Sequence, residues 1–197
     1  MPRELLSEEL QHMVKQIETR FLDRSQPEPM TAWRALFGDF TVLQNVMASF
    51  YLHPKSSWRA AFFNTATYRR NERQIGKEAL AILDLLGLEK AKDILAKNLP
   101  HGYQKMLGIA RALATRPKLL LLDEPSLGLA PKVVSDLAPV IKNINSRGVS
   151  VLLVEQSIPL FLRVAQWGYA LQVGRVVMDA DIGQFKSGLI RKAYLGG

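Results

Sequence analysis

Two adjacent carboxylates, Asp123 and Glu124, follow a run of four leucines and precede Pro125. A short continuous apolar run is typical of a buried parallel strand, and ligands of α/β proteins bind beyond the carboxyl ends of such strands. One carboxylate in this place could hold the magnesium ion of a nucleotide, while the other could orient and deprotonate an attacking water molecule. Taken alone, the pair more often indicates only a strand that runs into an acidic turn.

The segments around this pair add to its meaning. The hexapeptide Leu-Pro-His-Gly-Tyr-Gln at 99–104 precedes a predicted helix with an apolar face, and Ser-Leu-Gly-Leu at 126–129 follows Pro125. A second apolar run ends in Val154-Glu155-Gln156. In this order and spacing, the segments resemble the second half of the ATP-binding subunit of ABC transporters. Within that family, 119–131, 154–156 and 193–197 are similar to the subunits of branched-chain amino-acid importers.

The resemblance implies a role for each of ten positions. Asp123 corresponds to the metal-binding Walker B aspartate, Glu124 to the catalytic glutamate and Gln156 to the switch residue that senses the γ-phosphate. The remaining positions belong to the signature motif and the D-loop, which contact the ATP held by a second subunit: Leu99, Pro100, His101, Gly102, Tyr103, Ser126 and Gly128.

The family also implies cofactors and partners. They are ATP and Mg²⁺, a second ATP-binding subunit in a homodimer or heterodimer, and transmembrane permease subunits. The expected activity is ATP hydrolysis coupled to transport, at the cytoplasmic face of the plasma membrane. We expect no nucleic-acid partner and no membrane span of the chain's own, because no apolar run approaches about 18 residues.

One element of the family pattern is missing from the sequence. A P-loop requires Gly-x-x-x-x-Gly-Lys-Ser/Thr, in which backbone amides surround the phosphates and the lysine neutralises their charge. No such string occurs; Gly76-Lys77 is followed by Glu78, and Asn71 stands where the first glycine belongs. The resemblance therefore implies a truncated chain that lacks the N-terminal Walker A portion, with weak or absent ATP binding on its own.

The signature and the Q-loop also depart from the family pattern. Pro100 replaces the serine that hydrogen-bonds phosphate and has no N–H to donate, and Tyr103 replaces a glutamine. The stretch 30–35, where the Q-loop is expected, contains no glutamine. These departures keep a second hypothesis open, namely a non-catalytic interaction or regulatory module of an ABC assembly.

Composition excludes some classes of protein and leaves others open. Of 197 residues, 48% are hydrophobic, which suits one domain with a real core, and the absence of cysteine excludes disulfides and thiolate chemistry. The net charge of +8 and the basic, aromatic-containing stretch 55–77 suggest a third, weaker hypothesis of nucleic-acid binding. A solvated helical face explains that stretch more simply.

The fold class predicted is α/β: an incomplete P-loop NTPase fold with a parallel sheet, a helical subdomain and a C-terminal β-hairpin. We divide the chain into an amphipathic helix and linker unlike the family (1–30), a Q-loop-like remnant with the helical subdomain (31–98), and the core with signature, Walker B, D-loop and switch (99–197). The helix of the first part is expected over 4–23.

Four elements of the core are predicted from apolar periodicity. Strands at 119–122 and 149–154 are expected to be buried, parallel neighbours joined by a helix over 131–146 that Pro139 should kink. The hairpin is predicted from 169–173 and 176–179, with Gly174-Arg175 as its turn. We also expect the Walker B strand to lack a neighbour on one side, where the family places the P-loop strand. Self-association or dependence on a partner would follow.

Overall fold

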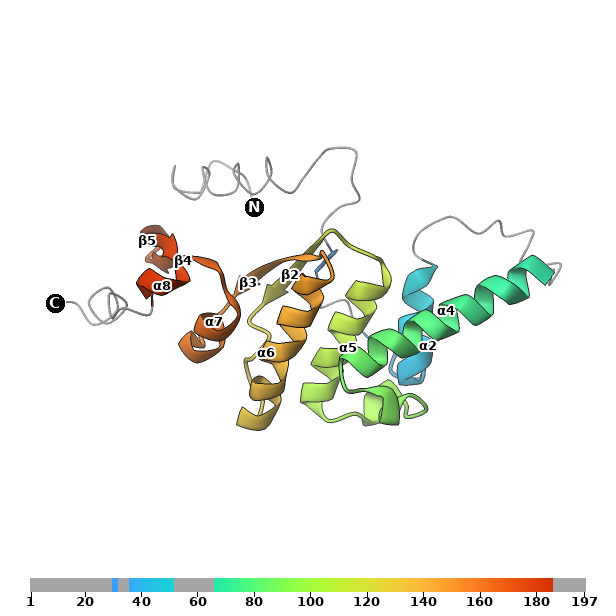
Figure 1. Ribbon diagram of the computed structural model, residues 1–197. Helices are drawn as coiled ribbons and strands as arrows, with labels where there is room; N and C mark the ends of the chain where they lie inside the picture. Colours follow the sequence, from blue (N-terminus) through green and yellow to red (C-terminus); the bar gives the residue numbers. More distant parts are fainter. Residues whose placement is uncertain (1–29, 32–35, 52–65, 186–197) are drawn as a thin grey trace. The chain divides into compact units, whose positions relative to one another are not determined.

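The computed structural model describes residues 30–31, 36–51 and 66–185. These residues fall into two compact units, one within Pro29–Val154 and one that begins at Glu155 (Figure 1). The predicted helix over 4–23 lies outside the described residues, and so does 55–65 of the basic stretch. The three domain boundaries stay a prediction.

A three-stranded parallel sheet forms the centre of the larger unit, in the order β1-β2-β3. Its strands are β1 (Met30–Thr31), β2 (Leu119–Asp123) and β3 (Ser150–Val154). The register pairs the first residues of β2 and β3 with each other and their last residues, Asp123 and Val154, with each other. The two strands therefore end at the same edge, which confirms the predicted parallel pair.

The position of β2 within the sheet corrects one expectation. β1 pairs with β2 at Leu120 and Leu121, and β3 pairs along its other side, so β2 has neighbours on both sides. Among the described strands, β1 and β3 stand at the two edges of the sheet. The first four residues of β3 are half-buried and Val154 is 54% exposed, so the prediction that this strand is buried is wrong. An apolar run does not reveal which strand stands at the edge.

Helix α6 (Pro131–Ser146) connects β2 to β3 and packs against β3, with the bounds predicted from the sequence. Proline at the first helical position costs nothing because its missing N–H has no helical partner there. The helix continues through Pro139. Leu137, Ile141 and Ile144 recur at steps of three and four and are buried, which is the reason this segment forms an amphipathic helix.

Three helices pack on one another in the same unit: α2 (Val42–Phe50), α4 (Ala66–Leu85) and α5 (His101–Ala114). Two short 3-10 turns, η2 (Glu89–Ala91) and η3 (Ala96–Asn98), connect α4 to α5. Figure 1 shows α2, α4 and α5 side by side. Helices α2 and α4 lie within 31–98, the stretch predicted as the helical subdomain, whereas α5 lies in the stretch assigned to the core. An ion pair of 2.5 Å joins Glu78 of α4 to Arg116, just after α5.

The second unit contains helix α7, the hairpin strands and a final short helix. Their bounds are α7 (Ile158–Val164), β4 (Trp167–Gln172), β5 (Arg175–Asp181) and α8 (Ile182–Gln184). The hairpin is confirmed, but its turn is Val173-Gly174 and not Gly174-Arg175, because Gln172 pairs with Arg175. Both turn residues have positive φ, 49° and 75°, as a type I′ turn requires. A valine there gave no turn signal in the sequence.

Candidate functional site

The two carboxylates lie where β2 leaves the sheet. Asp123 is the last residue of the strand and its side chain is exposed. Glu124 has φ 44°, and its N–H donates a 2.8 Å hydrogen bond to the carbonyl oxygen of Val154 at the end of β3. A non-glycine residue in the left-handed region is uncommon and often marks a functional turn. The structure thus puts both side chains at the carboxyl edge of the sheet, as predicted.

The chain from Glu124 to α6 is a loop held by its own backbone. The N–H of Leu127 donates to the carbonyl of Glu124 at 3.1 Å, and the N–H of Leu129 donates to the carbonyl of Ser126 at 3.1 Å. Gly128 has φ 71°, which a residue with a side chain would rarely adopt. We call residues 124–129 the carboxylate loop.

The hexapeptide 99–104 forms the start of α5. Leu99 is buried, Pro100 is the residue that caps the helix, and its carbonyl accepts from the N–H groups of Tyr103 and Gln104 at 2.9 and 3.1 Å. The side-chain amide of Gln104 also donates to the carbonyl of Leu99 at 2.9 Å. Two of the predicted site side chains, His101 and Tyr103, are exposed.

Gly102 is the point where this helix start meets the carboxylate loop. A Cβ atom at Gly102 would lie 3.4 Å from Leu129 Cδ2 and 3.4 Å from Val133 Cγ1. A side chain larger than a methyl group at position 102 would push the helix away from the loop. One turn further along α5, the Lys105 ammonium donates to the carbonyl of Leu127. The structure therefore places Gly102 of the predicted signature against Leu129 of the predicted D-loop, and it adds Lys105, which no sequence pattern singled out.

Gln156 belongs to the second unit, where it lies in a bend between β3 and α7 with an exposed side chain. Its neighbour Glu155 has a local role, because Glu155 Oε2 accepts from the N–H of Ser157 at 2.9 Å at the start of α7. A carboxylate at a helix start is favoured by the exposed N–H groups there.

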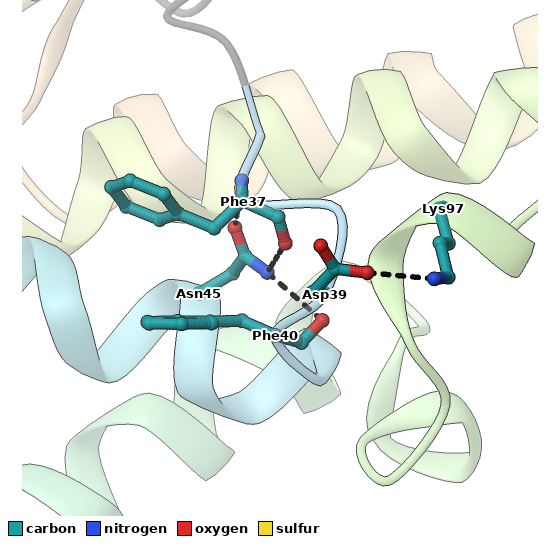
Figure 2. Close-up of polar contacts among 5 residues, drawn as sticks. All are labelled: Phe37, Asp39, Phe40, Asn45 and Lys97. Carbon is teal, nitrogen blue, oxygen red and sulfur yellow. Dashed lines mark hydrogen bonds and ion pairs between the residues drawn. The ribbon is translucent and has the colours of Figure 1, made fainter.

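A fully buried Asn45 fixes the segment that follows the expected Q-loop (Figure 2). Its Oδ1 accepts from the N–H of Phe37 at 3.0 Å, and its Nδ2 donates to three carbonyls, those of Phe37 at 2.9 Å, Thr41 at 3.0 Å and Phe40 at 3.3 Å. Asn45 was not among the residues predicted from the sequence. The available signal was a polar amide between the apolar residues Val42 and Val46, which lie with it on the buried face of α2.

The segment held by Asn45 also carries three exposed side chains, those of Phe37, Asp39 and Phe40. The rings of Phe37 and Phe40 lie 5.2 Å apart with nearly half of each side chain exposed, and the guanidinium of Arg111 lies 4.9 Å from the Phe37 ring centre. Asp39 pairs with Lys97 at 2.6 Å (Figure 2). The hydrogen bond and charge of Lys97 lower the pKa of Asp39 below its ordinary value.

The donors present fit part of a magnesium–nucleotide site. Magnesium is usually held by one or two carboxylates together with substrate phosphates, and the exposed carboxylate of Asp123 suits the protein's share of such a set. Within the described ranges, no three His, Asp or Glu side chains are grouped closely enough to hold a metal ion by themselves.

A parallel sheet whose central strand ends in Asp123, with the glycine-bearing start of α5 against the loop that follows, is an α/β fold. The family model described as ABC transporter matches residues 5–127, and the chain belongs to this family. None of the described helices is long and apolar enough to cross a membrane.

Two curated relatives from Pseudomonas aeruginosa are high-affinity branched-chain amino acid transport ATP-binding proteins. BraF is 32% identical over 163 residues, which is 82% of this chain and 64% of BraF. BraG is 46% identical over 103 residues, which is 52% of this chain and 44% of BraG. The chain therefore spans less than two thirds of the length of either relative.

A solved structure supports the fold. The ADP conformation of MJ1267, an ATP-binding cassette of an ABC transporter, matches with a TM-score of 0.63 and 24% identity, over 85% of this chain and 67% of that one. The predicted fold class, an incomplete P-loop NTPase fold of the ABC type, is confirmed.

Proposed function

We propose that this chain acts as an ATP-binding subunit of an ABC importer for branched-chain amino acids. The observation that carries the proposal is the similarity to BraF over 82% of the chain, together with the Asp123-Glu124 pair at the carboxyl edge of the sheet. ATP hydrolysis would supply the free energy for uptake. The partners would be a second ATP-binding subunit and permease subunits, at the cytoplasmic face of the membrane.

The carboxylate loop and the bend after β3 would provide the hydrolytic groups. Asp123 would bind Mg²⁺, which when present neutralises phosphate charge. Glu124 would orient the attacking water and accept its proton, and Gln156 would contact the γ-phosphate. The left-handed backbone of Glu124 supports this assignment, because such conformations cluster at active sites.

A second set of residues would contact the ATP held by the partner subunit. This set consists of residues at the start of α5 and in the carboxylate loop: Leu99, Pro100, His101, Gly102, Tyr103, Ser126 and Gly128. A helix start offers N–H groups and a positive dipole end to an anion. The exposure of His101 and Tyr103 is compatible with an approaching partner.

We further propose that this chain binds Mg-ATP weakly when it is alone. No P-loop string occurs in its 197 residues, and nothing else in the sequence replaces a lysine within a glycine-rich loop. Isothermal titration calorimetry with Mg-ATP tests this proposal. We expect no low-micromolar binding, and a low-micromolar dissociation constant for the isolated chain would contradict it.

The subunit proposal is tested by mixing the chain with full-length BraF and measuring ATP hydrolysis. We expect a rate above that of BraF alone, and a smaller increase when Glu124→Gln replaces the wild type, because the residues that contact the partner's ATP remain intact in this variant. A non-catalytic regulatory module is the second candidate, favoured by Pro100 and Tyr103 in place of the family's serine and glutamine. For such a module, Glu124→Gln would alter BraF activity no differently from the wild-type chain.

A further inference from the structure

Lys105 reaches from α5 to the backbone of the carboxylate loop. Its Nζ donates to the carbonyl oxygen of Leu127, which is 22 positions further along the chain. Lys105 lies three residues after Gly102, and residues at this spacing share one face of a helix. The face that presents Gly102 to Leu129 and Val133 therefore also presents Lys105 to Leu127.

The hydrogen bond from Lys105 reaches the carboxylate loop at the carbonyl of Leu127. The backbone bonds within the loop use the carbonyls of Glu124 and Ser126. The Leu127 side chain is 61% exposed, so its burial contributes little to holding that residue. Gly128 follows with φ 71° and has no heavy atom within 4 Å of its missing Cβ position.

Fixing this carbonyl fixes a whole peptide plane. The peptide unit is planar and trans, so the direction of the Leu127 C=O determines the opposite direction of the Gly128 N–H. A glycine with few steric constraints allows that plane to rotate readily. A hydrogen bond from a charged donor is roughly twice as strong as one between neutral groups, and it opposes the rotation.

We propose that Lys105 is a positioning residue that holds the carboxylate loop in a fixed orientation relative to the start of α5. It acts through the Leu127–Gly128 peptide and touches neither nucleotide nor metal. Its effect on hydrolysis rests on the proposed function, whereas its effect on the loop does not. The two segments that would face a partner's ATP are thereby kept as one rigid surface.

Hydrogen–deuterium exchange of the isolated full chain tests the tether directly. The variants are Lys105→Met, which keeps length without the charged donor, Lys105→Arg, which keeps the donor, and Lys142→Met as a control at an exposed position of α6. For Lys105→Met we expect amide exchange in 124–130 to rise about tenfold, as loss of one charged hydrogen bond allows. Lys105→Arg should restore protection, and Lys142→Met should match the wild type.

Unchanged exchange in 124–130 for Lys105→Met would overturn the proposal, and so would equal loss of protection throughout the unit. If Lys105→Met does not fold, Lys105→Gln is judged by the same criteria, because its amide is too short to reach the loop from α5.

The second measurement uses ATP hydrolysis by the mixture with BraF. We expect Lys105→Met to lower kcat with little change in KM for ATP, and Lys105→Arg to recover most of kcat. Faster exchange with unchanged kcat would overturn the positioning role. Absence of any hydrolysis increase with the wild-type chain would instead contradict the proposed function, and the exchange result would still decide whether the tether exists.

Discussion

The N–H of Glu124 donates to the carbonyl of Val154 at 2.8 Å, one position beyond the paired strand ends Asp123 and Val154. This bond extends the β2–β3 ladder just as the chain enters a left-handed turn at Glu124. The backbone at this carboxylate is thus held by the sheet although its conformation leaves the strand. The position of the Glu124 Cα–Cβ bond is therefore fixed relative to the sheet.

Replacing the carboxylate of Glu124 should affect hydrolysis and not folding. Glu124→Gln preserves shape, so we expect the thermal midpoint to stay within about 2 °C of the wild type, since changes of a few tenths of a kcal/mol shift it by no more. Hydrolysis in the mixture with BraF should lose the part of the increase that depends on Glu124, because a general base contributes roughly 10²- to 10⁴-fold. Exposed Glu89 provides the control variant Glu89→Gln, for which both measurements should match the wild type.

Asn45 should be one of the most sensitive polar positions in the larger unit. Asn45→Ala leaves the Phe37 N–H without its acceptor and removes one donor from each of three carbonyls that keep a backbone donor, so we expect a loss of about 1–3 kcal/mol in the free energy of unfolding. Urea denaturation measures it. Lys97→Ala, which removes the ion pair of the same segment in which both side chains are largely exposed, should leave the urea midpoint nearly unchanged. Equal effects of the two variants would contradict the role assigned to Asn45.

The hairpin turn offers a stabilising substitution. Val173 has φ 49° and a side chain that is 97% exposed, so it has the cost of a left-handed backbone without the benefit of burial. Val173→Asn should raise stability by about 1 kcal/mol, because asparagine tolerates this conformation in type I′ turns. Differential scanning calorimetry should show a higher melting temperature for the second unit. Val177→Asn in β5 is the control and should show no such gain, since asparagine is disfavoured within strands.

Gly168 should not accept a methyl group. A Cβ there would lie 2.3 Å from Phe161 Cζ and 3.2 Å from Phe185 Cε2, within a pair of rings packed edge to face. We expect Gly168→Ala to cost about 1–3 kcal/mol through overpacking. Gly168→Ala should cost less in a chain that already carries Phe161→Leu than in the wild type, because the shorter side chain leaves room for the added methyl group. A double-mutant cycle with urea denaturation measures this difference. Strict additivity would argue against the clash.

Acid should remove the contribution of Glu78. Hydrogen bonds from Gln74 and from Arg116 lower the pKa of Glu78, so the folded state favours the carboxylate. Its stabilising effect is therefore present above the pKa of the unfolded chain and is lost as pH falls through the lower folded pKa. Glu78→Gln should be less stable than the wild type by on the order of 0.5 kcal/mol at pH 7, a value reduced by the exposure of Arg116.

The pH dependence itself is the measurement for this pair. The difference in urea midpoint between wild type and Glu78→Gln should vanish on acidification. A difference independent of pH would show that packing, and not charge, accounts for it.

The sequence predicted those features that depend on local side-chain patterns. Strand β2 follows from a continuous apolar run, α6 from apolar residues at a period of about 3.6, and the hairpin from two strand-like segments on either side of a glycine-containing turn. The Asp-Glu pair at the strand end could be anticipated for the same reason. The sequence could not show which strands lie at the edge and which at the centre of the sheet, because the order of strands depends on contacts between distant segments, such as β1 with β2.

Three other features escaped because they depend on long-range geometry. The tether from Lys105 to Leu127 and the packing of Gly102 on Val133 join segments more than twenty positions apart. The position of the hairpin turn was missed because the pairing of Gln172 with Arg175 places Val173 in a left-handed conformation that valine disfavours.

The amide of Asn45 has a consequence for how this surface can change during evolution. It binds the backbone of the 37–41 segment and none of its side chains, so the shape of the segment is encoded at a position outside the exposed stretch. Asp39 and the two phenylalanines can be exchanged for other residues without altering the path of the chain. The backbone of the 37–41 segment can therefore stay the same while its exposed side chains change, and with them the molecules that this surface could recognise.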